Sequence, residues 1–340
     1  MHVGYAKTGS TWLQKSVFGR PDGPFLLLPL LDALEYFVFR DDAETAPGRI
    51  AAELAGFRTR ADAADAVPVV SHEVLVGDQT QGRYWGHQVA RRLQAVFPDA
   101  RVLMVIREQT AMLVSSYRQH LHVGGTETLA AFFSRQPGFE ATCRPDFLAY
   151  DRMIAFYQEL FGRDRVCVLP FELLGADPAE FARRVTGFAG ARTASAPSPS
   201  VEHPGFGAAT LLVRRRLNRL AGGWTYADGP EPPAGWRRAD RLSVYLDRLI
   251  PTRVQAARKR DLARQAAALV GDRFAASNRL TRELTGLDLA ALGYRTAFFA
   301  ALPLTSLDPL PYNPSLAFGC TPARPRVAPR HDPSRPLLHV

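Results

Sequence analysis

The residues best suited to chemistry stand at the start of the chain, where positions 3–13 read Val-Gly-Tyr-Ala-Lys-Thr-Gly-Ser-Thr-Trp-Leu. Val3 and Tyr5 favour a strand, the glycines at 4 and 9 permit the backbone angles of a tight loop, and the residues from Ser10 onward show helical spacing. A helix entered through such a loop begins with unpaired N–H groups, which favour an anion together with the helix dipole. Lys7 adds a full positive charge, so the pattern predicts an anion-binding loop.

The spacing of this loop is close to that of the nucleotide-binding motif G-x-x-x-x-G-K-[ST], with one difference. Gly4 and Gly9 have the right separation and Thr11 has the hydroxyl position, but Ser10 occupies the lysine position and the lysine stands at 7. The chain strongly prefers arginine, since lysine occurs only at 7, 15 and 259 among 42 basic residues. The compact ammonium group of a lysine can donate a proton to a reacting group, whereas the planar guanidinium of an arginine keeps its protons.

A second pattern follows the clearest apolar run, residues 101–106. Arg107 ends this predicted strand, and Ser115 and Tyr117 lie on the predicted helix that follows. A guanidinium binds a phosphate bidentately, and a hydroxyl two turns along the next helix can complete the contact. A strand-end arginine can equally be structural.

A third pattern is Val69-Val70-Ser71-His72-Glu73, in which an imidazole and a carboxylate stand just past a short apolar strand. Either group can act as a general base. The alternative is that one of them caps the next segment or forms a surface ion pair.

These patterns together resemble sulfotransferases that use 3′-phosphoadenosine 5′-phosphosulfate (PAPS). The stretch that resembles their 5′-phosphosulfate loop comprises Lys7, Thr8, Gly9, Ser10, Thr11 and Trp12. Arg107, Ser115 and Tyr117 resemble their 3′-phosphate motif. The resemblance implies in-line transfer of a sulfuryl group to an acceptor hydroxyl, with Glu73 favoured over His72 as the base and Lys7 stabilising the charge on the leaving oxygen. It implies that Trp12 stacks on adenine, although core packing would explain this residue equally well.

The resemblance extends over about residues 2–295 and is strongest to bacterial members. It includes Phe171-Glu172-Leu173-Leu174 after a strand and the run from Leu287 to Tyr294. The basic C-terminal loop of the cytosolic small-molecule enzymes is not found. The three arginines at 214–216 could supply part of the 3′-phosphate site, but an exposed basic helix face is the favoured interpretation.

The elements that must position these residues alternate along the chain. We expect strands near 3–5, 25–28, 67–71, 101–106 and 165–170, and helices near 10–19, 41–66, 86–97, 109–122, 145–161, 177–188, 211–220 and 237–284. Apolar strands alternating with helices predict a three-layer α/β/α fold with a central parallel sheet, like that of P-loop NTPases. Ligands of such sheets bind beyond the carboxyl ends of the strands. We predict one sulfotransferase domain over 1–300 and a poorly ordered proline-rich tail over 301–340.

Composition narrows the function further. The net charge of +9 suggests acidic partners, and three widely spaced cysteines suggest a reducing compartment. With neither a signal peptide nor a transmembrane run expected, we predict a cytoplasmic protein. No acidic cluster suits Mg²⁺, so we expect PAPS as the only cofactor and no metal.

Two other functions remain open: a P-loop-type kinase or NTPase with a displaced lysine, and a non-catalytic basic protein that binds polyanions. We see no nucleic-acid-binding fold, and therefore expect no nucleic acid partner. The acceptor could be a carbohydrate, a lipid or a small metabolite. The oligomeric state stays open.

Overall fold

The computed structural model describes residues 1–40, 46–134, 140–191, 205–221 and 233–297. Its strands form two parallel pairs. β1 (Phe25–Leu27) pairs with β2 (Val67–Val69), and β3 (Val102–Ile106) pairs with β4 (Val166–Pro170). The predicted strands at 25–28, 67–71, 101–106 and 165–170 are therefore confirmed, each with bounds that differ by a residue or two.

The first residues of the chain join the two pairs into one parallel sheet. The His2 N–H donates to the Val70 carbonyl (2.8 Å), and the Leu103 N–H donates to the Met1 carbonyl (2.7 Å). The strand expected at 3–5 is only a bridge at His2, because the chain turns away after Val3 and the Tyr5 ring packs against Phe147 and Tyr150. The order across the sheet is β1, β2, residues 1–3, β3, β4.

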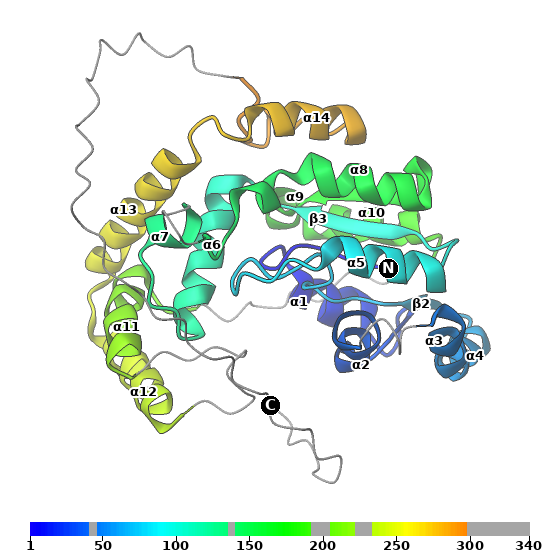
Figure 1. Ribbon diagram of the computed structural model, residues 1–340, viewed down its shortest axis with the longest axis horizontal. Helices are drawn as coiled ribbons and strands as arrows, with labels where there is room; N and C mark the ends of the chain where they lie inside the picture. The colour runs from blue at the N-terminus through cyan, green and yellow to red at the C-terminus, as the bar shows by residue number, and fades with distance from the viewer. Residues whose placement is uncertain (41–45, 135–139, 192–204, 222–232, 298–340) are drawn as a thin grey trace, which may run out of the picture. The chain divides into compact units, whose positions relative to one another are not determined.

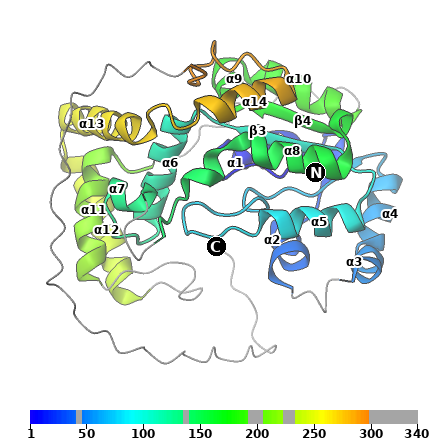
Figure 2. The same cartoon turned by 45° about the horizontal axis from the view of Figure 1, so that its top comes forward.

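Each face of this sheet has its own apolar core, because successive side chains of a strand point to opposite faces. Val102, Met104 and Ile106 belong to the larger core, and Leu103 and Val105 belong to the smaller one. The larger core contains residues of α3 (Pro47–Glu53), α4 (Ala55–Ala63), α5 (Gly86–Val96) and α8 (Tyr150–Phe161). The smaller core contains residues of α1 (Ser10–Leu13), its π-helical continuation Gln14–Phe18, α9 (Phe171–Ala176) and α10 (Pro178–Ala189). The three-layer α/β/α prediction is confirmed (Figures 1 and 2).

Of the remaining helices, the last packs against α8, and the others lie toward the carboxyl ends of the strands. They are α2 (Leu30–Leu34) with the π-helical turn Glu35–Phe39, α6 (Gln109–His122), α7 (Leu129–Phe133), α11 (Ala208–Leu220), α12 (Ala234–Leu249), α13 (Thr252–Val270) and α14 (Ala275–Thr285). Single 3₁₀ turns cover Pro145–Leu148 and Arg163–Arg165. In both views α11, α12 and α13 lie beside α6 and α7 (Figures 1 and 2). The helix expected over 237–284 is interrupted near Pro251 and Gly271.

For Arg214, neither interpretation given to the arginines at 214–216 is right: it belongs neither to an exposed basic face nor to a phosphate site. Its side chain is fully buried on α11, where Nη1 lies 2.9 Å from an Asp240 carboxylate oxygen and the guanidinium stacks 4.7 Å above the Trp236 ring. It also donates to Asn218 and Ser243. Arg214 therefore joins α11 to α12.

Within the described ranges, no helix is long and apolar enough to cross a membrane. The predicted tail at 301–340 lies outside the described residues.

Candidate active site

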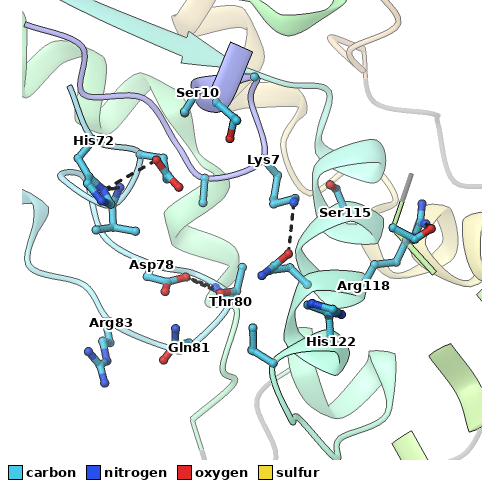
Figure 3. A pocket seen from close by; sticks show the side chains of 18 of the residues that line it. Lys7, Ser10, His72, Asp78, Thr80, Gln81, Arg83, Ser115, Arg118 and His122 are labelled. Atoms are coloured by element: carbon cyan, nitrogen blue, oxygen red, sulfur yellow. Dashed lines mark hydrogen bonds and ion pairs between the residues drawn. The ribbon is translucent and has the colours of Figure 1, made fainter. Parts of the chain in front are cut away.

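A cavity of about 1110 Å³ opens at the carboxyl edge of the sheet, where ligands of parallel sheets bind. Segments that follow β1, β2, residues 1–3, β3 and β4 line it. They contribute, in chain order, Lys7, Gly9, Ser10, Thr11, His72, Glu73, Arg107, Ser115 and Phe171. The three sequence patterns thus meet in one cavity, as the strand-end argument predicts (Figure 3).

The loop at 6–10 has the backbone of an anion-binding turn. Lys7 (φ 72°) and Gly9 (φ 83°) both have left-handed angles, a conformation that disfavours lysine. A Cβ atom on Gly9 would lie 2.6 Å from Cδ2 of the buried Leu174, so a larger residue would have to displace that side chain as well as adopt the left-handed angle. The Oγ of Ser10, which lines the cavity, is buried without a hydrogen-bond partner. This loop therefore holds a polar group ready for a ligand.

Side chains from other elements hold the loop in place. The buried Gln79 amide donates to the Ala6 carbonyl (3.2 Å) and to Ser116 Oγ on α6 (3.0 Å). Thr8 is also buried and donates to the Tyr5 carbonyl (2.5 Å). The hydroxyl of Thr8 therefore serves the loop itself and does not line the cavity.

Lys7 and Arg107 form the cationic centre of the cavity. Lys7 Nζ donates to Gln119 Oε1 on α6 (3.3 Å), and Arg107 Nη1 donates to the Lys7 carbonyl (2.9 Å). The Arg107 guanidinium also lies 4.4 Å from the centre of the Phe171 ring. Arg107 thus ties the end of β3 to the loop, and both cations face the same space.

His72 stands opposite Ser115 and Arg118 of α6 in Figure 3, and Glu73 lies beside His72. His72 Nδ1 lies 3.8 Å from a Glu73 carboxylate oxygen and accepts the Val74 N–H at 3.3 Å. Burial lowers the pKa of His72, and the Glu73 carboxylate opposes this shift. Glu73 is the more exposed of the two side chains.

Besides Thr8, two further predicted ligand residues do not line the cavity. Trp12 is 6% exposed and packs edge-to-face against Phe181 in the smaller core, which favours the core-packing alternative. Tyr117 is 1% exposed, and its hydroxyl donates to the Glu127 carbonyl. Ser115 does line the cavity, one helical turn before Arg118.

Some residues that support the site carried no signal in the sequence, and others belong to the runs 171–174 and 287–294 noted above. Gln79 and Gln119 are single polar residues without a motif spacing. Glu172 accepts the Glu108 N–H and the Tyr294 hydroxyl, and the Tyr150 hydroxyl donates to the Arg107 carbonyl. The runs 171–174 and 287–294 therefore meet next to the end of β3, where their hydrogen bonds support the segment that carries Arg107.

Lys7, Arg83, Arg107 and Arg118 give the cavity wall an excess of positive charge over Glu73 and Asp78. No group of three or more metal-binding side chains occurs in the part of the chain that the structure describes. The arrangement can hold an anionic ligand against the loop with a carboxylate beside it.

The chain was compared with known proteins. A family model described as "Sulfotransferase family" matches residues 2–195, more than half of the chain. A crystal structure of a sulfotransferase from Alicyclobacillus acidocaldarius is similar at 20% identity, covering 69% of this chain and 96% of that chain, with a TM-score of 0.42. No curated protein matches the chain.

Proposed function

The chain belongs to the sulfotransferase family, and on this premise we propose that it transfers a sulfuryl group from PAPS to an acceptor hydroxyl. The observation that carries the proposal is the meeting of Lys7, Glu73 and Arg107 in one cavity. A cationic loop, a base and a strand-end arginine are what this reaction needs. The finer assignments below rest on the chemistry of these side chains.

The loop fits the donor. Ser10 Oγ is a buried polar atom without a partner, and Ser10 lines the cavity between Gly9 and Thr11. Gly9, Ser10 and Thr11 would hold the 5′-phosphosulfate with their amides, as helix N-termini hold phosphates. PAPS, when bound there, supplies the sulfuryl group and a phosphate leaving group. Arg107 and Ser115 would hold its 3′-phosphate.

Glu73 is the proposed base. Because His72 Nδ1 accepts the Val74 N–H, a neutral His72 carries its proton on Nε2 and offers no free lone pair at either nitrogen. Glu73 accepts protons through either carboxylate oxygen. It would remove the acceptor's proton as the hydroxyl attacks, which contributes roughly 10²–10⁴-fold in rate.

Lys7 is the proposed electrostatic group. Negative charge develops on the leaving phosphate oxygen during transfer, and a preorganised cation with aligned amides stabilises it. The left-handed backbone of Lys7 and the clamp of Arg107 on its carbonyl fix where this side chain begins. The Nζ contact with Gln119 holds the ammonium toward the cavity.

The remaining parts of the proposal concern metal, cellular location and the extent of the catalytic domain. We propose that no metal takes part and that the protein is cytoplasmic, consistent with the free thiols of Cys143 and Cys167. The tail at 301–340 would lie outside the catalytic domain of 1–300.

Calorimetric titration with 3′-phosphoadenosine 5′-phosphate (PAP), compared with Mg·ATP, tests the donor. We expect micromolar or tighter binding of PAP without metal. Arg107→Ala should weaken it most, by about 10–100-fold, because a charge-assisted contact is lost. Lys7→Ala should weaken it less, and Lys15→Ala, which removes an exposed lysine outside the cavity, should change nothing. Preference for Mg·ATP would move the chain to the kinase class, and a folded protein that binds neither nucleotide would refute the proposal.

A further inference from the structure

The order of the strands divides the cavity into two ends. Across the sheet, the segments that line it follow β1, β2, residues 1–3, β3 and β4 in that order. The loop at 7–11 stands in the middle, with Arg107 and Phe171 on the β4 side. Glu73 stands on the β1 side, and Leu34 and Phe39 lie beyond it, after β1. If the donor lies between the loop and Arg107, the acceptor must approach from the β1 side.

The wall on this side is apolar. Leu34, Phe39, Val74 and Trp85 line it. Phe39 is 60% exposed although it lines the cavity, so its ring is available to a ligand. Trp85 is fixed by a 2.7 Å hydrogen bond from Nε1 to the Val74 carbonyl. This wall can bury the apolar body of a ligand.

A tight turn at 78–83 presents an arginine at the same end. Asp78 and Arg83 exchange backbone hydrogen bonds of 2.7 and 3.0 Å, and the Asp78 carboxylate caps the turn by accepting from the Thr80 N–H and hydroxyl. Arg83 lines the cavity, and among the described residues no hydrogen bond or ion pair to its guanidinium is found. The turn therefore offers a cation to the cavity, while the Asp78 carboxylate is used within the turn by Thr80.

Gln81 adds a second polar group from this turn. Its Oε1 is buried without a partner and lines the same cavity, so it is available to a donor group of a ligand. In Figure 3 Gln81 and Arg83 lie beyond Asp78 and Thr80, on the far side from Lys7 and Ser10. The turn and the loop thus stand at different ends of the cavity.

We propose that the acceptor is an apolar hydroxyl compound that carries an anionic group, and that Arg83 binds this group while the wall of Leu34, Phe39 and Trp85 covers the apolar body. The proposal rests on the sulfuryl transfer proposed above. An anionic acceptor is repelled by the anionic donor in the same cavity, so a cation at the far end offsets this repulsion. Arg83 thus selects acceptors that carry an anionic group and takes no part in the chemical step.

Binding of defined probes to the PAP-loaded full chain tests the idea. One series shares a phenol: 4-hydroxyphenylacetate is anionic, tyrosol is neutral and tyramine is cationic. The other series shares an alkyl chain: 12-hydroxydodecanoate is anionic and 1,12-dodecanediol is neutral. Saturation-transfer NMR or calorimetry should give the anion of at least one series about tenfold tighter binding than its neutral partner. Arg83→Gln should abolish this preference and leave PAP affinity unchanged.

The matched control is Arg253→Gln, which removes the same charge from an exposed position outside the cavity. It should keep the preference for the anion. The proposal is overturned if the wild type does not prefer the anion in either series, which includes binding none of the probes, or if the preference survives in Arg83→Gln. Failure of PAP itself to bind would instead refute the donor assignment, so the two failures are distinguished.

Discussion

Gly9 is the residue of the loop for which the structure makes the sharpest prediction. Gly9→Ala forces an L-residue into a left-handed angle, which costs about 1–2 kcal/mol. It also places a methyl group 2.6 Å from Leu174 Cδ2 in the smaller core, and overpacking of this kind costs typically about 1–3 kcal/mol. We therefore expect a loss of about 2–5 kcal/mol in the free energy of unfolding.

Gly286 provides the matched control. It ends α14 with nearly the same backbone angles as Gly9, φ 73° and ψ 5° against φ 83° and ψ 20°, but a Cβ atom there meets nothing within 4 Å. Gly286→Ala should therefore cost only the angle term, about 1–2 kcal/mol. The difference between the two variants isolates the steric contact with Leu174.

Urea unfolding followed by tryptophan fluorescence measures these losses, since Trp12 is buried in the same core. A double variant supplies a second test: Leu174→Ala removes the atom that clashes, so Gly9→Ala with Leu174→Ala should be less destabilised than the sum of the single variants by about 1–2 kcal/mol. PAP affinity should fall in Gly9→Ala and not in Gly286→Ala. The reasoning fails if the two glycine variants lose equal stability, or if the double variant is additive.

The structure also predicts how substitutions of other side chains change kcat or the free energy of unfolding. Glu73→Gln should lower kcat by roughly 10²–10⁴-fold with little change in PAP affinity; an unchanged kcat in single-turnover assays would exclude it as the base. Arg214→Met should cost about 1–3 kcal/mol, because it leaves the buried Asn218 Oδ1 without its donor, while Arg216→Met on the exposed side of α11 should cost under about 0.5 kcal/mol in the same urea assay. Burial lowers the pKa of His2 to about 3, so below pH 6.5 the unfolded chain binds a proton that the folded chain does not. This group should therefore reduce stability by about 2 kcal/mol on going from pH 7 to pH 5. His2→Asn should flatten this part of the pH dependence of the urea midpoint, and an identical dependence in both proteins would contradict the assignment.

The strands were predictable from the sequence because each is a short apolar run bounded by polar residues. The strand expected near 3–5 was placed too late, since the pairing lies at residues 1–3 and depends on Val70 and Leu103, which lie far along the chain. Arg214 was misread for a different reason. Leu211, Arg214 and Asn218 are all buried on one side of α11, and the helical spacing of these three positions would have indicated it.

The meeting of the three sequence patterns followed from one rule, that parallel strands end at the same edge. The rule says nothing of side chains that approach from loops. Gln79 and Arg83 belong to a turn whose shape depends on backbone pairing between Asp78 and Arg83, and a single sequence contains no spacing that reveals it. Trp12 could not be assigned because stacking on a base and packing in a core favour the same residue type.

The position of residues 1–3 between β2 and β3 has a consequence for how the protein folds. The segment that carries the anion-binding loop precedes both strands that pair with it, since β2 and β3 come later in the chain. Contacts between distant parts of a chain form slowly, because closing the intervening loops costs entropy. The loop therefore gains its shape only when the two halves of the sheet close around it. On a ribosome, nucleotide binding would mark the completion of β3 and not the emergence of the loop itself.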